Sequence, residues 1–134
     1  MEKILRLILR LVGSAALLAV LAVVMPYEMM DAIHGRLGLG RLPADPIVGY
    51  LARSLSAFYA LVGALMWMLS GDVRRHRPTI LFLGGAFIVF GIVLVGVDWV
   101  EGLPLWWRCG EGPWVSLIGV AIAWTASRVP PAAD

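Results

Sequence analysis

Four long hydrophobic runs, separated by short polar segments, dominate the chain. They cover residues 4–25, 47–69, 79–97 and 113–129. A helix that crosses a membrane needs roughly 20 mainly apolar residues. The first three runs meet this need, and the fourth is shorter. The pattern therefore predicts a single all-α domain, an integral membrane four-helix bundle.

Prolines mark the predicted starts of the second, third and fourth helices. Pro46, Pro78 and Pro113 each stand at the head of a hydrophobic run, and proline suits the first helical position because its missing N–H has no partner there. Asp45 is a candidate N-cap for the second helix.

The overall composition favours a membrane protein over a soluble one. Hydrophobic residues make up 60% of the 134 residues and charged residues only 15%, whereas soluble domains carry about 25% charged residues. The mean hydropathy is +0.87. The basic residues form no continuous stripe, so we expect no nucleic-acid partner. The expected partner is membrane lipid.

The basic residues of the short loops predict the orientation in the membrane. Seven fall on one predicted side and three on the other, with Arg53 inside a span. The larger group is Lys3, Arg6, Arg10, Arg74, Arg75, Arg77 and Arg128, and the smaller group is Arg36, Arg41 and Arg108. Both termini are therefore expected on the cytoplasmic side. The first run resembles a secretory leader but lacks a good cleavage site, and we expect it to stay on the chain.

A short interfacial helix is predicted directly after the first span, over Tyr27–Gly35. Glu28, Asp31 and His34 recur every three residues and share its polar face. Two carboxylates and an imidazole are acceptable ligands for zinc or another divalent ion. The alternative is a solvated amphipathic helix whose acidic residues favour its N-terminus.

Arg53 lies inside the second span, where an arginine is costly unless it is paired or hydrated. One interpretation is an ion pair with Asp98, or with Glu101, that fixes the helix register. The other is a site open to the outside for an anionic or polar ligand, because a guanidinium binds carboxylate and phosphate well. The candidate ligand-binding residues are Arg53, Asp98, Glu101, Tyr59 and His34.

Two further features leave alternatives open. The tryptophans over residues 98–107 suit membrane-interface anchors, or else line an aromatic mouth for a lipid-like or quinone-like ligand. Small residues repeat along the runs and suit close helix packing, either within the bundle or in a homo-oligomer or larger membrane complex. The repeats are Ser56, Ala60 and Ala64; Gly119, Ala123 and Ser127; Ala15 and Ala19; and Gly84, Gly85 and Gly91.

Several chemistries find no support in the sequence. Haem ligation across a bundle needs histidines within spans, whereas His34 and His76 fall in loops. No Ser-His-Asp or Cys-His set is apparent around the single Cys109. We therefore expect no catalytic residues and no cofactor, and the question of enzymatic activity stays open.

The chain has four short predicted spans, an outer segment after the first span, and the sequence Arg-Ser-Leu-Ser-Ala-Phe-Tyr (residues 53–59) at the head of the second. This plan resembles the DoxX-like group of small bacterial membrane proteins, and the resemblance covers the topology and roughly residues 53–104. This resemblance implies a multi-pass protein of the inner (plasma) membrane. Some members of that group accompany quinone-linked oxidoreductases.

The sequence thus favours a non-enzymatic accessory or scaffold subunit, or a binder of a small ligand, with a polar cluster facing outward. The alternatives are an oligomeric transporter or channel for small molecules, and a subunit that supports quinone-linked redox chemistry.

Overall fold

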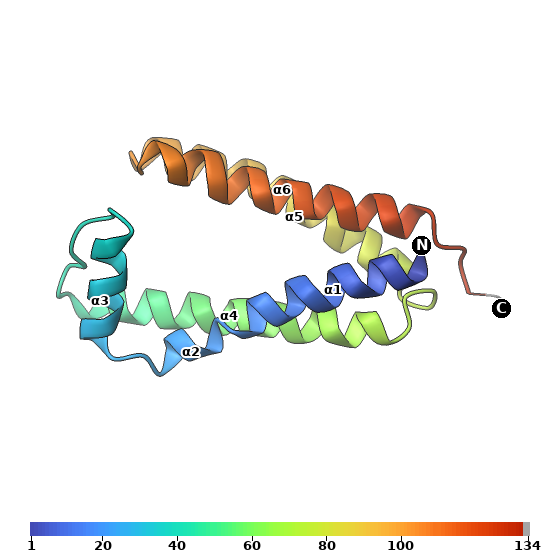
Figure 1. Cartoon of the computed structure of the whole chain (residues 1–134), viewed down its shortest axis with the longest axis horizontal. Helices are drawn as coiled ribbons and strands as arrows, with labels where there is room; N and C mark the ends of the chain where they lie inside the picture. The colour runs from blue at the N-terminus through green and yellow to red at the C-terminus, as the bar shows by residue number, and fades with distance from the viewer. Residues whose placement is uncertain (133–134) are drawn as a thin grey trace. The chain divides into compact units, whose positions relative to one another are not determined.

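The computed structural model describes residues 1–132, and within this range the regular structure is entirely helical. The all-α prediction is confirmed for these residues. In chain order (Figure 1) the helices are α1 (Glu2–Leu17), α2 (Val20–Val23), α3 (Tyr27–Arg36), α4 (Pro46–Gly71), α5 (Arg77–Val100) and α6 (Leu105–Ser127).

The chain forms two compact units. Unit 1 consists of residues 1–10 together with the chain from Met68 onward, and unit 2 consists of Leu11–Trp67. Unit 1 therefore contains α5 and α6, and unit 2 contains α2 and α3. Helices α1 and α4 each contribute residues to both units.

Three helical stretches are long and apolar enough to cross a membrane. They are Glu2–Val23 with 22 residues, Pro46–Gly71 with 26 and Arg77–Val100 with 24. They correspond to the first three predicted spans. Helix α6 has 23 residues but is less apolar, since its first half carries Arg108 and Glu111.

The predicted helix starts meet different outcomes. Helix α4 begins at Pro46, and Asp45 caps it: its Oδ1 accepts a hydrogen bond from the Ile47 N–H at 3.0 Å. Pro78 is the second residue of α5. The predicted start at Pro113 is wrong, because α6 begins after Pro104 and Pro113 lies inside it.

The early start of α6 has a local cause. Gly102 adopts a positive φ of 69°, which favours glycine because it has no Cβ, and Pro104 then opens the helix. The helix runs through Pro113, although a proline in a helix interior removes one backbone hydrogen bond. Neighbouring helices make such prolines tolerable in membrane helices.

In unit 1, α5 and α6 run antiparallel and side by side (Figure 1). Glycines bring their backbones together at two levels. A Cβ built on Gly84 would lie 2.8 Å from the Ala123 nitrogen, and one on Gly91 would lie 2.5 Å from the Gly112 carbonyl oxygen. Small residues permit this close approach, so α6 follows α5 along most of its length.

Unit 1 also holds most of the fully buried side chains. They come from α1, the end of α4 and the turn after it, the start of α5, and the end of α6 and the residues just after it. They are Leu5, Leu9, Leu69, Val73, Ile80, Ile122, Ala126 and Val129. Arg77 lies at the same end of α5 and α6. Its Nε donates to the Ala126 carbonyl at 3.1 Å, and its Nη2 donates to the Ser127 carbonyl at 3.3 Å. The guanidinium thus caps the C-terminus of α6.

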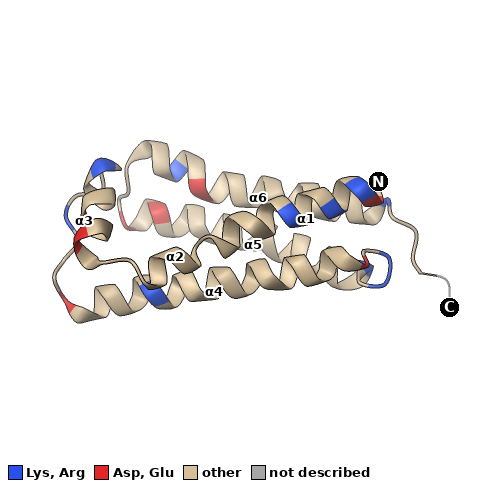
Figure 2. Ribbon diagram, turned by 60° about the horizontal axis from the view of Figure 1, so that its bottom comes forward, with Lys and Arg blue, Asp and Glu red and all other residues tan. Residues whose placement is uncertain are grey.

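In unit 2, the first hydrophobic stretch packs against α4, and Figure 2 shows α2 next to α4. The closest approach is at Gly13 and Gly63, where a Cβ built on Gly63 would lie 2.5 Å from the Gly13 carbonyl oxygen. One turn away, the Trp67 indole N–H donates to the Ser14 hydroxyl at 3.1 Å. The stretch then breaks between α1 and α2, and it ends before Pro26. The short helix predicted over Tyr27–Gly35 is present as α3.

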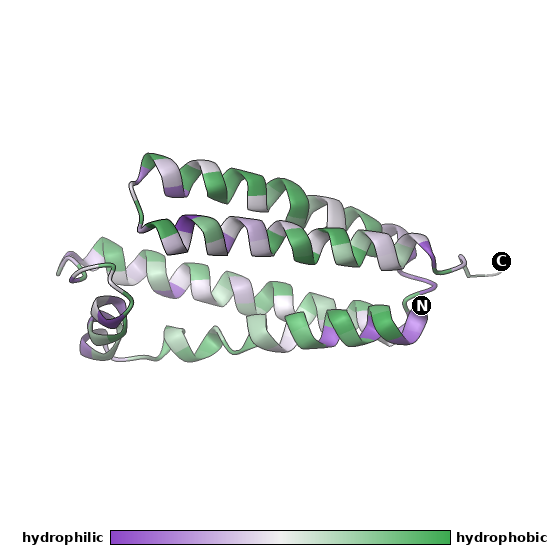
Figure 3. Ribbon diagram, turned by 45° about the horizontal axis from the view of Figure 1, so that its top comes forward, coloured by the Kyte–Doolittle hydropathy of each residue, from purple (hydrophilic) through white to green (hydrophobic). Residues whose placement is uncertain are grey.

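Many large hydrophobic side chains of the long helices point outward. Phe58 on α4 is 59% exposed, and Phe82 on α5 is 77% exposed. In Figure 3 hydrophobic positions extend along the long helices, whereas hydrophilic ones gather on α3 and near the helix ends. Apolar surface of this extent is rare on soluble monomers.

Candidate functional site

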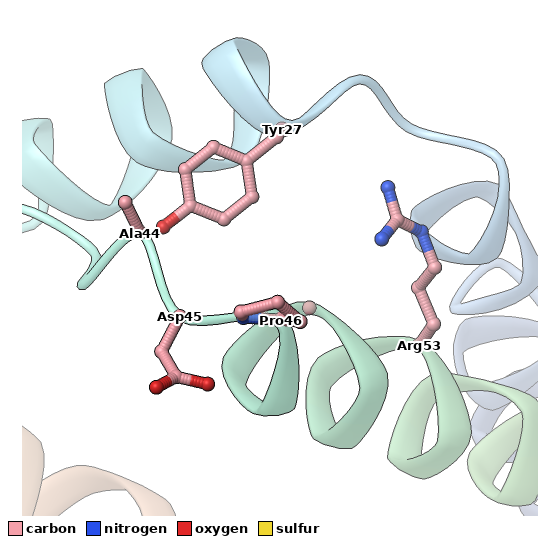
Figure 4. A pocket seen from close by; sticks show the side chains of 6 residues that line it. Tyr27, Ala44, Asp45, Pro46 and Arg53 are labelled. Atoms are coloured by element: carbon pink, nitrogen blue, oxygen red, sulfur yellow. The ribbon is translucent and has the colours of Figure 1, made fainter.

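Unit 2 contains a pocket of about 320 Å³ between the start of α3 and the first two turns of α4 (Figure 4). Its lining comes from the first residue of α3, the residues leading into α4 and one face of α4. The lining residues are Tyr27, Ala44, Asp45, Pro46, Gly49 and Arg53.

Arg53 is held in the pocket wall by backbone carbonyl groups. Its Nε donates to the Val23 carbonyl and its Nη2 to the Met25 carbonyl, both at 3.1 Å. Val23 is the last residue of α2 and Met25 lies two residues beyond it, at a helix end where carbonyls lack partners within the helix. Pro26 follows and offers no N–H. The guanidinium supplies the missing donors and is thereby fixed in position.

Gly49, one turn before Arg53 on α4, leaves room beside the guanidinium. A Cβ built at this position would lie 3.0 Å from Nη1 of Arg53. Nε and Nη2 face the α2 end, so Nη1 is the nitrogen next to this space. The pocket therefore offers a charged donor group with room for a small ligand.

Hydrogen bonds fasten the connection between α3 and α4 around the pocket. The Tyr27 hydroxyl donates to the Pro43 carbonyl. Oδ1 of Asp31 accepts from the Leu42 N–H at 2.7 Å, and Nδ1 of His34 lies 2.9 Å from the Gly40 carbonyl oxygen. These contacts tie α3 to the loop that forms one side of the pocket.

The same contacts bear on the predicted metal ligands Glu28, Asp31 and His34. Asp31 and His34 bind the loop, and Asp31 also lies 3.7 Å from the Arg41 guanidinium. Among residues 1–132, no group of three histidine, cysteine or acidic side chains is close enough together to hold a metal ion. Asp31 and His34 thus hold the loop between α3 and α4 against α3.

Two charged side chains line the pocket, the basic Arg53 and the acidic Asp45. Within unit 2, no carboxylate lies within ion-pair distance of Arg53. Asp45 lines the pocket, but its carboxylate is turned away from Arg53 (Figure 4) and caps α4. The charge of Arg53 is therefore shared only with uncharged carbonyl groups of unit 2.

Of the five predicted ligand-binding residues, Arg53 is the one that lines the pocket. Tyr59 lies further along α4, and His34 lies on α3 facing the loop. Asp98 and Glu101 belong to unit 1. Asp98 is 2% exposed, and its Oδ2 has no hydrogen-bond partner among the described residues. The pairing of Arg53 with Asp98 or Glu101 stays a prediction.

Sequence reasoning missed Gly49 and the carbonyl partners of Arg53. Two signals point to them. Pro26 ends an apolar run and thereby marks carbonyls without helical partners. A glycine four residues before an arginine of an apolar run leaves space on the same helix face.

No protein-family model matches the chain, and comparison with curated proteins and with solved structures likewise finds no match. The resemblance to the DoxX-like group therefore stays an expectation from the sequence.

Proposed function

We propose that this chain is an integral membrane protein that binds a small anionic group, a carboxylate or a phosphate, in the Arg53 pocket. One observation carries this proposal. The Arg53 guanidinium is fixed by two carbonyls and borders a pocket of about 320 Å³, and no carboxylate of unit 2 pairs with it. The role is one of binding rather than catalysis.

The fixed guanidinium suits such a ligand on physical grounds. Ordering a flexible side chain normally costs binding free energy. The two hydrogen bonds to carbonyls already restrict Arg53, so a ligand meets less of this cost. A charge-assisted hydrogen bond is roughly twice as strong as a neutral one. A ligand that presents an anionic oxygen to Nη1 gains this strength without reorganising the site.

The membrane placement that accompanies this proposal has four spans, with both termini in the cytoplasm. The close contact of α6 with α5 supports the fourth span, because a helix that follows α5 reaches similar depths. Its 23 residues correspond to about 34 Å. The seven-to-three division of basic residues supports the orientation. The pocket then opens on the outer side.

Ligand-dependent thermal unfolding of the full chain in detergent tests the binding site. Sodium phosphate and sodium acetate are the probes, with sodium chloride at equal ionic strength as the reference. We expect at least one probe to raise the melting temperature, because a ligand that binds only the folded state stabilises it.

Gly49→Leu is the decisive variant, since its side chain fills the pocket and crowds Nη1 of Arg53 while keeping the arginine in the chain. Gly71→Leu on the same helix is the matched control, because a Cβ there meets nothing within 4 Å. The anion-dependent rise should vanish in Gly49→Leu and persist in Gly71→Leu. An equal rise in both variants would contradict the pocket as the binding site.

A fusion of green fluorescent protein to the C-terminus tests the topology. Cytoplasmic fluorescence is expected for four spans, since the reporter folds on that side. Labelling of the C-terminus from outside would instead mean that α6 does not cross.

A further inference from the structure

A second hollow lies on the first half of α6, in unit 1. It has a volume of about 370 Å³ and is formed by Trp106, Trp107, Gly110, Glu111 and Trp114. Trp106, Gly110 and Trp114 are spaced four residues apart and so share a helix face. A Cβ built on Gly110 meets nothing within 4 Å. The glycine thus leaves a gap between two large indoles.

Hydrogen bonding and ring packing order the side chains of this hollow. The Trp107 indole N–H donates to Oε2 of Glu111 at 2.6 Å, one helical turn away. The rings of Trp106 and Trp107 meet edge to face, with centroids 5.3 Å apart. The hollow therefore combines aromatic rings with a carboxylate held by one of them.

The carboxylate of Glu111 has no basic partner in unit 1. The nearest arginine in sequence, Arg108, is engaged elsewhere. Its Nε donates to the Leu103 carbonyl, and its guanidinium lies over the Trp99 ring at 4.7 Å from the centroid. No ion pair within the described part of unit 1 includes Glu111. The charged side chain in the lining of the hollow is therefore a carboxylate without an ion-pair partner in unit 1.

We propose that this hollow binds an alkylammonium group. Indole faces attract organic cations, and aromatic cages are a common site for choline-like groups. An unpaired carboxylate adds attraction for a cation and disfavours an anion. A neutral, flat ligand would use the tryptophans but would gain nothing from the charge of Glu111.

A lipid headgroup is the expected source of this ammonium. Trp106 is 54% exposed and Trp114 65% exposed, and tryptophans of this kind settle at the membrane–water interface. Zwitterionic lipids present an ammonium at that depth. The site lies in a different unit from the Arg53 pocket and has the opposite charge preference, so it does not depend on anion binding there.

Native mass spectrometry of the full chain in mild detergent tests the site. The protein is mixed with equal amounts of phosphatidylethanolamine and phosphatidylglycerol that carry the same acyl chains. We expect phosphatidylethanolamine to be retained over phosphatidylglycerol by about five-fold, the size of a typical cation–π gain. Glu111→Gln keeps an acceptor for Trp107 but removes the charge, and Gly110→Leu fills the gap. Both should bring the ratio close to one.

Two controls separate this effect from general changes. Asp72→Asn also removes one negative charge, and Gly96→Leu also adds a leucine at a helical glycine with open space around it. Both should keep the wild-type ratio. A wild-type ratio near one, or a ratio unchanged in Glu111→Gln, would overturn the lipid assignment.

A second measurement distinguishes a lipid from a free amine. Tetramethylammonium chloride is titrated against the tryptophan fluorescence of the wild type and of Glu111→Gln. Saturable binding that Glu111→Gln abolishes supports the ammonium site even if the lipid ratio is one, and then assigns it to a soluble amine. Absence of both effects would refute the site.

Discussion

Arg53 in unit 2 and Arg77 in unit 1 perform the same structural task in different surroundings. Each donates Nε and Nη2 to two carbonyls at the end of a helix, α2 for Arg53 and α6 for Arg77. Arg77 is the first residue of α5, whereas Arg53 lies two turns inside α4 and borders a pocket. The two arginines therefore share the capping role, and only Arg53 also borders the pocket proposed as a binding site.

The helix pairs of the two units show why the space exists in one of them. In unit 1, α5 and α6 touch at Gly84 and again at Gly91, two turns apart, so they stay together. In unit 2, the first stretch touches α4 at Gly63 and then breaks after Leu17. The pocket forms beyond α2, between the start of α3 and the start of α4.

Gly91→Leu should have the largest effect. Its new side chain would meet the Ser116 hydroxyl and the Gly112 carbonyl, and backbone atoms cannot move aside without separating α5 from α6. We expect a loss of stability of about 3 kcal/mol or more, toward the upper range for overpacking. The measurement is the folded fraction in detergent against denaturant. Gly85→Leu, where a Cβ meets nothing within 4 Å, should keep nearly wild-type stability. Equal losses of stability in the two variants would contradict the close packing of α5 against α6 at Gly91.

Gly63→Leu should be costly but less so, because unit 2 has one such contact point. The Cβ at this position would lie 2.7 Å from the Leu17 nitrogen. We expect a loss of about 2 kcal/mol in the same assay. A loss larger than that of Gly91→Leu would reverse the ranking of the two helix pairs.

Arg53→Leu and Arg77→Leu should lose similar stability, about 2 kcal/mol each, since each removes hydrogen bonds from a charged donor to helix-end carbonyls. They should differ in ligand response. Only Arg53→Leu is expected to lose the anion-dependent rise in melting temperature. If Arg77→Leu loses it as well, the anion acts through overall stability and not through the pocket.

Glu2→Gln should have the smallest effect. The Glu2 carboxylate accepts a hydrogen bond from Nε of Arg74 at 2.6 Å, and this bond raises the pKa of the Arg74 guanidinium above its ordinary value. Both side chains are exposed to solvent, where ion pairs contribute little. Unfolding curves of Glu2→Gln and wild type should coincide within error at moderate salt, and a clear shift would indicate a role in assembly.

The features that sequence predicted well depend on local rules. The start of α4 at Pro46, its Asp45 cap and the short helix α3 follow from backbone geometry within a few residues. The predicted start of α6 at Pro113 was wrong, because the turn at Gly102 lets the helix begin already after Pro104.

The candidate site was only partly predictable. The cost of a charge in an apolar run identified Arg53, but sequence reasoning sought a carboxylate partner because side-chain charges are visible in a sequence. The partners of Arg53 are instead backbone carbonyls, which every residue carries and which a sequence therefore does not single out. Their position depends on where the helix breaks between α1 and α2. The hollow at Gly110 was missed for a similar reason, since a gap is the absence of a side chain.

The two arginine caps also differ in the order in which a ribosome makes their parts. Arg77 is synthesised 49 residues before Ala126, so its guanidinium is already present when the end of α6 emerges. Arg53 follows Val23 by 30 residues. The first apolar stretch is therefore complete before its cap exists, and its final carbonyls depend on other donors, such as water, until α4 is made.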